Sequence, residues 1–381
     1  MKKSNLKFFI CATEQSGENL AHKIIKEIKL KIPKSKFAGV AGTKTSKFFY
    51  KKIYSTSDFK SIGIIELFGS IRKYIKMIDH LSEVIIKEKF DFVITFDSPD
   101  FNYRLAKKIK SKKYLGKAIH FVAPTVWAWR KNRAKLFSKV YDKLFTILPF
   151  ENKYFEKYNL STTFIGHPIY YLNKSYKYKY KYNKKSYIAF LPGSRETEIK
   201  SLMRYFDLAS KYLYENKYNF KIFIPTLPHL KKLINHHTLN WTIKPEIITD
   251  SKLIEKKFKL TYFAIVCSGT ASLEITLRKI PQLVIYKLNI FTEIILKLMS
   301  DIRYANLINI LSSKMIIPEI TNSNLNDRVF IKSLSNLINN YKFQYKSQII
   351  GSKKYINKFI LKKSPSEISI KEIKNYFFQS H

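Results

Sequence analysis

Short apolar runs, each separated from the next by a segment long enough for a helix, constrain the fold of this chain more than any other feature. Among them are Leu6–Thr13, Phe92–Phe96, Ala118–Val122, Ile188–Leu191 and Phe263–Cys267. Runs this short are typical of parallel strands that helices cover on both faces. The sequence therefore predicts an α/β fold, and two Rossmann-like halves in tandem are the simplest arrangement.

The alternation of strand and helix patterns is interrupted once, and this interruption predicts the domain organisation. Residues 172–187 combine lysines and tyrosines without a helical apolar period, which indicates a basic linker. The alternating Lys and Tyr could stack on single-stranded RNA, although an exposed connection is the favoured interpretation. We expect one domain over 1–171, a second over 188–340, and a helical tail over 341–381 that could pack back on the first domain.

The net charge of +42 over 381 residues is extreme. An anionic partner such as RNA, an acidic membrane surface or a phosphorylated substrate would explain it. A biased codon supply would also explain it, because Lys, Ile, Asn, Tyr and Phe are all abundant. The charge therefore permits an anionic partner without identifying one.

The cysteines and the hydropathy pattern predict a reducing compartment and no membrane span. Cys11 and Cys267 lie inside apolar runs, so we expect buried thiols and neither a disulfide nor a metal site. No apolar run approaches the roughly 18–20 residues that cross a bilayer. The start of the chain imitates a signal peptide, but its apolar stretch is short and runs into polar residues. We expect a cytoplasmic protein.

In the first half, polar residues follow two of the predicted strands. Open α/β sheets bind ligands beyond the carboxyl ends of their strands. Glu14, Ser16 and Gly17 open a helix whose start favours an anion, and the glycine permits close approach; a turn capped by Ser16 is the alternative. Asp97 could take a proton from an attacking hydroxyl or could cap the next helix. For Asp100 capping is the favoured interpretation.

Two loops in the second half suit a nucleotide. Gly193, Ser194 and Arg195 form a turn at a helix start, where backbone N–H groups and a guanidinium could meet a diphosphate. A capped helix with an i,i+3 ion pair is the alternative. Residues 268–274 leave room for a phosphate, and Glu274 could bind both hydroxyls of a ribose. A tightly packed helix start is the alternative there, but it does not explain why the Glu274 carboxylate lies so near an apolar strand. Together the loops predict a nucleotide donor in the second half and an acceptor in the first.

An ordered series of motifs covers roughly residues 6–320. It consists of 14–17, 63–67, 97–102, 122–130, 148–151, 164–168, 191–195, 268–274 and Asn309. The tryptophan-rich segment 122–130 is its most specific member. With this series the chain resembles glycosyltransferase family 19, the lipid-A-disaccharide synthases. The resemblance implies two Rossmann-like domains that face a cleft, the glycosyltransferase-B architecture.

The resemblance also implies a reaction and the residues that carry it. UDP-2,3-diacylglucosamine would condense with 2,3-diacylglucosamine 1-phosphate (lipid X), with inversion, to give the lipid A disaccharide 1-phosphate and UDP. Asp97 matches the general base. The nucleotide-sugar site matches Gly193, Ser194, Arg195, Ser268, Gly269, Thr270, Ala271, Glu274 and Asn309. The acceptor side or the cleft matches Glu14, Ser16, Gly17, Trp127, Arg130 and His167. No metal and no cofactor are implied, because helix starts and Arg195 can offset the charge of the leaving group.

Some of these positions have a structural alternative or depart from the family. Trp127 and Arg130 could form a cleft wall with a cation for the acceptor phosphate, or core packing beside a solvated basic helix. His167 could donate to a ligand or could be a structural histidine at the domain hinge. This chain has Glu18 where the family commonly has aspartate, and Ile308 where proline is usual.

Both implied substrates carry acyl chains, so we expect a peripheral protein on the cytoplasmic face of the inner membrane. Ile62–Ile78 and Ile290–Met299 could enter the headgroup region, or they could be amphipathic helices that face the core. A homodimer is left open, and no nucleic acid partner is expected. The alternative functions are another UDP-sugar transferase or epimerase of the same fold, and a basic RNA-binding protein.

Overall fold

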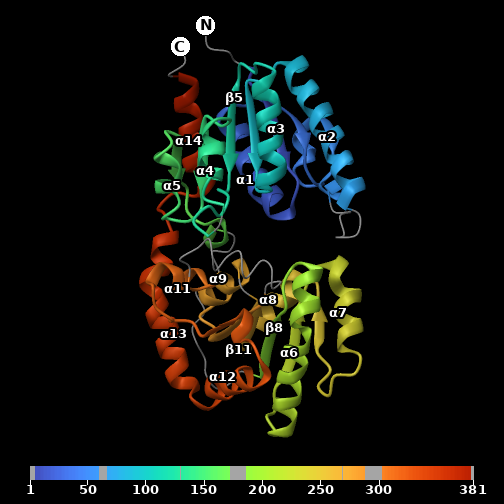
Figure 1. The fold of residues 1–381 in the computed structure, drawn as a ribbon, viewed down its shortest axis with the longest axis vertical. Helices are drawn as coiled ribbons and strands as arrows, with labels where there is room; N and C mark the ends of the chain where they lie inside the picture. The colour runs from blue at the N-terminus through green and yellow to red at the C-terminus, as the bar shows by residue number, and fades with distance from the viewer. Residues whose placement is uncertain are drawn as a thin grey trace. The chain divides into compact units, whose positions relative to one another are not determined.

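The computed structural model describes residues 5–59, 67–128, 130–171, 186–267, 269–287 and 303–378. The chain forms two compact units, each with its own parallel sheet (Figure 1). The first unit combines Met1–Tyr171 with Phe359–His381, and the second is Leu172–Lys358. The predicted α/β class is confirmed in both units.

The first unit is built on a seven-stranded sheet with the order β3-β2-β1-β4-β5-β6-β7. All of its neighbouring strands are parallel. The strands are β1 (Lys7–Ala12), β2 (Lys36–Val40), β3 (Phe49–Tyr54), β4 (Phe92–Phe96), β5 (Lys117–Phe121), β6 (Lys143–Thr146) and β7 (Ser161–Phe164). The helices are α1 (Gln15–Lys31), α2 (Leu67–Glu88), α3 (Pro99–Ser111), α4 (Arg133–Ser138), α5 (Asn152–Glu156) and α14 (Pro365–Phe378).

Alternate residues of β1 enter separate parts of the core of the first unit. Phe8 and Ile10 pack in a cluster with apolar residues of α1 and with Ile370 and Ile373 of α14. Phe9 packs in another cluster with apolar residues of α2 and α3. Successive side chains of a strand point to opposite faces of a sheet. Helices therefore cover this sheet on both faces, as the short apolar runs predict.

The second unit is built on a six-stranded sheet with the order β10-β9-β8-β11-β12-β13, again with parallel neighbours. The strands are β8 (Tyr187–Leu191), β9 (Lys221–Pro225), β10 (Glu246–Ile248), β11 (Thr261–Cys267), β12 (Gln282–Tyr286) and β13 (Glu319–Thr321). The helices are α6 (Glu196–Glu215), α7 (Lys231–Thr238), α8 (Ser251–Lys259), α9 (Thr270–Leu277), α11 (Leu307–Ser312), α12 (Asp327–Asn339) and α13 (Tyr341–Ile356). Cys11 and Cys267 are free and buried, as expected for structural thiols.

The boundary between the second unit and the C-terminal tail lies later in the chain than the sequence pattern predicts. The tail was expected from residue 341, but α13 lies in the second unit and the chain returns to the first unit only at Phe359. Two contacts explain this correction. Tyr341 stacks on Tyr262 with ring centroids 3.7 Å apart, and the side chain of Gln348 accepts a hydrogen bond from the Gln282 backbone N–H at 2.9 Å. Residues 172–185 of the predicted linker lie outside the described residues.

In each sheet the strand order reverses once, and the reversal brings two loops together. In the first unit the reversal lies between β1 and β4, where Ala12 pairs with Phe96 at the carboxyl ends. In the second unit it lies between β8 and β11, where Leu191 pairs with Val266. Doubly wound sheets bind ligands at this switch point.

Within the described residues, every helix is too short or too polar to cross a bilayer. Part of the predicted membrane-facing segment Ile62–Ile78 lies in α2. Its first residues, 62–66, and the whole of Ile290–Met299 lie outside the described residues.

Replacing Ile373 with Ala should destabilise the first unit selectively. Ile373 is 1% exposed and belongs to α14, which packs against α1 although the two helices lie at opposite ends of the chain. The loss of a buried aliphatic side chain should cost about 2–4 kcal/mol. Hydrogen exchange should show faster exchange of β1 and β4 amides, with β8 and β11 amides unchanged. Lys371→Ala, an exposed change on the same helix, is the control. Faster exchange confined to β8 and β11 would contradict the assignment of α14 to the first unit.

Candidate functional site

The turn after β4 has an unusual backbone. Asp97 and Ser98 have φ values of +53° and +42°, both in the left-handed region that residues with a side chain rarely adopt. Pro99 follows at the first position of α3. Two consecutive left-handed residues cost free energy, of order 1–3 kcal/mol each, that surrounding contacts must offset. Such strain is concentrated at functional sites, and here it lies at the switch point of the first sheet.

Two serine–carboxylate hydrogen bonds join the loops after β1 and β4 reciprocally. The Ser16 hydroxyl donates to Asp97 Oδ2 at 2.7 Å, and the Ser98 hydroxyl donates to Glu14 Oε1 at 2.6 Å. Each loop therefore supplies one hydroxyl and one carboxylate. The other oxygen of Asp97, Oδ1, accepts the Ser98 backbone N–H at 3.0 Å. These contacts hold the left-handed turn, and the sequence alternatives in which Ser16 or Asp97 acts as a helix cap are not what the structure has.

Gly17 makes the close approach of the two loops sterically feasible. A Cβ atom at this position would lie 3.2 Å from both Cβ and the carbonyl oxygen of Phe96, and 3.5 Å from Cβ of Asp97. The predicted residues Glu14, Ser16, Gly17 and Asp97 are thus brought together in one place.

The tryptophan-rich segment is held by a buried carboxyl group. Trp127 donates from Nε1 to Glu151 Oε1 at 3.3 Å, and its ring meets Phe150 edge-on. Glu151 also accepts the backbone N–H groups of Ile147 and Leu148. Burial raises the pKa of Glu151 to about 8, against the opposing effect of these donors. Sequence reasoning did not single out Glu151, although its position after β6 and in the motif 148–151 was a usable signal.

Arg130 lies on the exposed part of the same segment. Its Nη1 lies 3.8 Å from Asp100 Oδ1, and Arg133 also forms an ion pair with Asp100. Asp100 therefore links two arginines instead of capping α3. Trp129 lies outside the described residues. The arrangement fits both a cation for an acceptor phosphate and a half-buried tryptophan that is held in place by Glu151.

His167 holds the return of the chain to the first unit. Its side chain is 6% exposed, and its Nδ1 accepts the Ile169 backbone N–H at 3.3 Å. Its own backbone N–H donates to the Phe359 carbonyl at 3.0 Å. Burial lowers the pKa of His167 to about 4, so the imidazole is neutral at ordinary pH. The structural alternative fits this environment, and a contact of His167 with a ligand stays a prediction.

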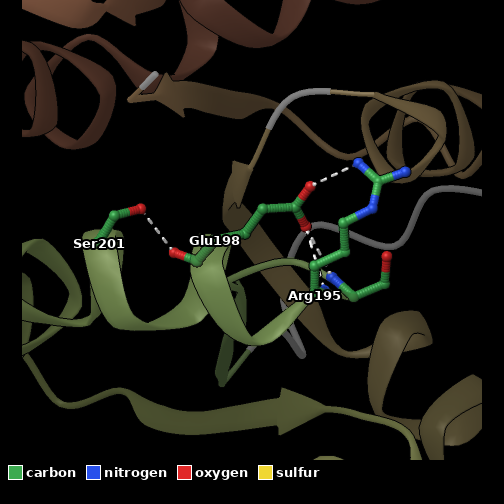
Figure 2. Close-up of polar contacts among 4 residues, drawn as sticks. Arg195, Glu198 and Ser201 are labelled. Carbon is green, nitrogen blue, oxygen red and sulfur yellow. Dashed lines mark hydrogen bonds and ion pairs between the residues drawn. The ribbon is translucent and has the colours of Figure 1, made fainter. Parts of the chain in front are cut away.

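In the second unit, the start of α6 is closed by a glutamate of the same helix (Figure 2). Glu198 Oε2 accepts the backbone N–H groups of Ser194 at 3.0 Å and of Arg195 at 3.3 Å, and Oε1 lies 3.3 Å from Nη1 of Arg195. Gly193 has φ +120°, and a Cβ there would meet the Glu198 carboxylate at 2.4 Å. The alternative of a capped helix with an i,i+3 ion pair is thus observed. Both amides that are predicted to meet a diphosphate are therefore engaged by Glu198 here, and the diphosphate contact stays a prediction.

The start of α9 is open by contrast. Gly269, its N-cap residue, has φ +108° and no side chain with which to cap the helix, and no described atom lies within 4 Å of a Cβ added there. Gly269 and Thr270 are exposed and Ala271 is half-buried, whereas Ser268 lies outside the described residues. Uncapped N–H groups at a helix start are a ready anion site.

Glu274 is oriented by a buried arginine. Arg278 lies 2.9 Å from Glu274 Oε1 and 2.8 Å from Glu255 Oε2, and its side chain is 3% exposed. The Glu274 side chain keeps 36% exposure and lies one helical turn from the open start of α9. The predicted tight packing of the helix is therefore present together with a carboxylate that remains accessible.

Asn309 lies in α11, and its side chain bonds the backbone just before β13. It is fully buried, its Oδ1 accepts the N–H groups of Ile316 and Ile317 at 2.9 Å each, and its Nδ2 donates to the Ile317 carbonyl at 2.7 Å. The hydrogen bonds of its side chain thus hold the backbone of 316–317, and a direct contact with the nucleotide sugar stays a prediction. The unusual Ile308 fits, because its N–H donates to the Asn306 side chain that caps α11, a bond that proline could not make.

Glu18, the other departure from the family pattern, also has a structural role. Its carboxylate is buried and accepts the backbone N–H groups of Lys44 and Thr45 in the loop after β2. Across the described residues, no group of three or more His, Cys, Asp and Glu side chains is placed to hold a metal ion.

Comparison with known proteins agrees with the fold and the motifs. The family model described as lipid-A-disaccharide synthetase matches residues 8–373. Lipid-A-disaccharide synthase of Rickettsia prowazekii is 33% identical over 97% of this chain and 99% of that relative. The enzyme of the same name from Rickettsia canadensis is 34% identical over 98% of each.

Solved structures of low sequence identity share the fold. The UDP-GlcNAc 2-epimerase from Neisseria meningitidis bound to UDP-GlcNAc has a TM-score of 0.60 at 14% identity, covering 97% of this chain and 100% of that one. MurG from Acinetobacter baumannii has a TM-score of 0.57 at 13% identity, covering 97% and 99%.

Two parallel α/β units, each with polar loops at its switch point, give the chain the glycosyltransferase-B fold. Within that class the chain belongs to the lipid-A-disaccharide synthetase family. It is a hexosyltransferase of lipid A biosynthesis.

Glu151 should make the stability of the first unit depend on pH. The folded state binds a proton up to about pH 8, whereas the unfolded chain releases it near pH 4.3. Stability from this group is therefore complete below about pH 4.3 and falls as the pH rises to about 8, by at most about 1.4 kcal/mol per pH unit. Urea unfolding at pH 5, 6.5 and 8 should show that Glu151→Gln removes this contribution. The exposed Glu156→Gln should keep the wild-type slope; an equal slope in Glu151→Gln would contradict the prediction.

Proposed function

We propose that this enzyme condenses UDP-2,3-diacylglucosamine with 2,3-diacylglucosamine 1-phosphate (lipid X), with inversion, to give the lipid A disaccharide 1-phosphate and UDP. The observation that carries the proposal is the pair of switch points. One holds a carboxylate in a strained turn, and the other holds an open helix start beside an accessible carboxylate. Family membership supplies the substrate class.

Asp97 is proposed as the general base. The acceptor 6-hydroxyl would give its proton to Asp97 while its oxygen forms a bond to the anomeric carbon of the donor, and the bond from that carbon to UDP would break. Hydrogen bonds from Ser16 and from the Ser98 backbone fix both carboxylate oxygens. Each oxygen keeps lone-pair capacity for a substrate proton.

The donor is proposed to bind at α9 and Arg195. The diphosphate would accept hydrogen bonds from the N–H groups at Gly269 and Thr270, next to Ser268 and Ala271. The Glu274 carboxylate would accept hydrogen bonds from the ribose hydroxyls. Arg278 fixes the rotamer of Glu274 in advance, which reduces the entropy lost on binding. The negative charge that develops on UDP would be stabilised by the helix start and the Arg195 guanidinium.

The acceptor is proposed to bind in the first unit, near Glu14, Ser16, Gly17 and Trp127. Arg130 would meet its 1-phosphate, since an arginine suits a phosphate geometrically. Its present partner, Asp100, is 71% exposed, so exchange for a phosphate requires little desolvation.

Asp97→Asn should lower kcat by at least about a hundredfold, the scale of general-base catalysis. The amide keeps the shape of the side chain but cannot take the proton. Release of UDP with lipid X as acceptor is the measurement. Asp100→Asn, a carboxylate three positions away in the same motif, is the control and should retain most of the activity. A kcat for Asp97→Asn close to that of the wild type would remove Asp97 from its proposed role.

The enzyme is further proposed to act peripherally on the cytoplasmic face of the inner membrane, where both acylated substrates would lie. On α2, Arg72, Lys73 and Lys76 are exposed, and Ile75 between them is 47% exposed. These cations border a hollow of about 650 Å³ that is also lined by Tyr54, Asp58 and Met77. Exposed cations around an apolar residue suit an anionic lipid surface. A homodimer and the absence of a nucleic acid partner stay predictions.

Replacing Arg72 and Lys76 with Gln together should weaken binding to phosphatidylglycerol vesicles at least about fivefold, since each surface cation contributes about 1 kcal/mol. Vesicle flotation at moderate salt measures this. Lys87→Gln with Lys89→Gln makes the same charge change at the other end of the helix and should have a smaller effect. Equal losses in both variants would show that total charge, and not this surface, governs the binding.

A further inference from the structure

The helix starts at the second switch point differ in how their positive ends are occupied. The start of α9 has no side-chain cap and open space at Gly269. The start of α6 has a carboxylate of its own, because Glu198 accepts two backbone N–H groups there. Within the part of the chain that the structure describes, the start of α9 is therefore open to a phosphate and that of α6 is not. This difference leaves the role of Arg195, at the closed start, to be explained.

Glu198 connects the closed helix start to Arg195. Its Oε2 serves the backbone and its Oε1 faces Nη1 of the guanidinium at 3.3 Å (Figure 2). The Glu198 side chain is 21% exposed, whereas that of Arg195 is 75% exposed. The carboxylate is thus held by the backbone N–H groups that its Oε2 accepts. The Arg195 side chain extends from it toward solvent. A guanidinium has five donors, and this ion pair leaves most of them available.

We propose that Glu198 is a positioning residue for donor binding: it holds the Arg195 guanidinium ready for the diphosphate, while the N–H groups of α6 take no part. The inference rests on the proposed donor site at α9 and Arg195. An arginine side chain loses much rotamer freedom when it is fixed. A partner that fixes it before the ligand arrives removes part of that loss from the binding equilibrium.

The negative charge of Glu198 does not defeat this arrangement. Two backbone N–H groups, the start of a 20-residue helix and the guanidinium all offset it. The second oxygen of the carboxylate, Oε2, accepts both backbone N–H groups. A diphosphate would therefore meet the outer face of the guanidinium and not a free carboxylate.

The test is a double-mutant cycle on UDP binding, measured by isothermal titration calorimetry with Glu198→Gln, Arg195→Ala and the double variant. The Gln side chain keeps an oxygen for the backbone but loses the ion pair. We expect Glu198→Gln to raise the Kd of UDP about fivefold, within the range of a partly exposed ion pair, and to have no further effect in the Arg195→Ala background. Glu196→Gln changes the same charge in the first turn of α6, where Glu196 pairs with Lys200 and, among the described residues, accepts no backbone N–H group, so it should leave the Kd unchanged.

Each other outcome overturns the inference. Tighter UDP binding by Glu198→Gln would make Glu198 a competitor of the diphosphate. An unchanged Kd, with a lowered melting temperature, would make it a helix cap alone. A rise in Kd that persists in the Arg195→Ala background would show that Glu198 does not act through Arg195. If Glu198→Gln does not fold, Glu198→Asp, which keeps the charge but is one methylene shorter, takes its place in the cycle. Failure of the wild type to bind UDP would instead refute the donor site itself.

Discussion

The reversal of strand order in each parallel sheet is the constraint on which the functional site depends. It places the ends of β1 and β4 together in one unit, and the ends of β8 and β11 together in the other. Loops that are more than 80 residues apart in the chain can then exchange hydrogen bonds, as the loops of Ser16 and Asp97 do at a separation of 81. Because the strands are parallel, the helices that follow them also start at this edge, with their positive ends near the same place. A carboxylate chemistry in the first unit and a phosphate chemistry in the second both follow from this one topological feature.

The two units manage charge in different ways. In the first, serine hydroxyls and backbone N–H groups hold carboxylates in place, so that a strained turn is stable. In the second, the open start of α9 offers an anion site. The N–H groups at the start of α6 are instead bonded to Glu198 of the same helix. The total charge of +42 decides neither arrangement. Local geometry does, because interactions between exposed charges fade beyond about 8–10 Å at physiological salt.

Much of this was accessible from the sequence, because strand ends and helix starts leave short-range signals. The α/β class and the loops containing Asp97, Arg195 and Glu274 were predicted, and the structure gathers Glu14, Ser16, Gly17 and Asp97. Long-range contacts were not accessible. The stacking of Tyr341 on Tyr262 keeps α13 in the second unit, and no local pattern could show it. Nor could the pattern show that the polar side chains of Asn309 and His167 are turned inward, or that the amides of Ser194 and Arg195 are already occupied.

A crystal structure of the enzyme with UDP and lipid X bound tests the central claim most directly. The account predicts the diphosphate on the backbone N–H groups at the start of α9, with the ribose hydroxyls at Glu274. It also predicts the acceptor 6-hydroxyl within about 3 Å of an Asp97 carboxylate oxygen. UDP bound in the first unit, or an acceptor hydroxyl far from Asp97 with no carboxylate beside it, would contradict the account.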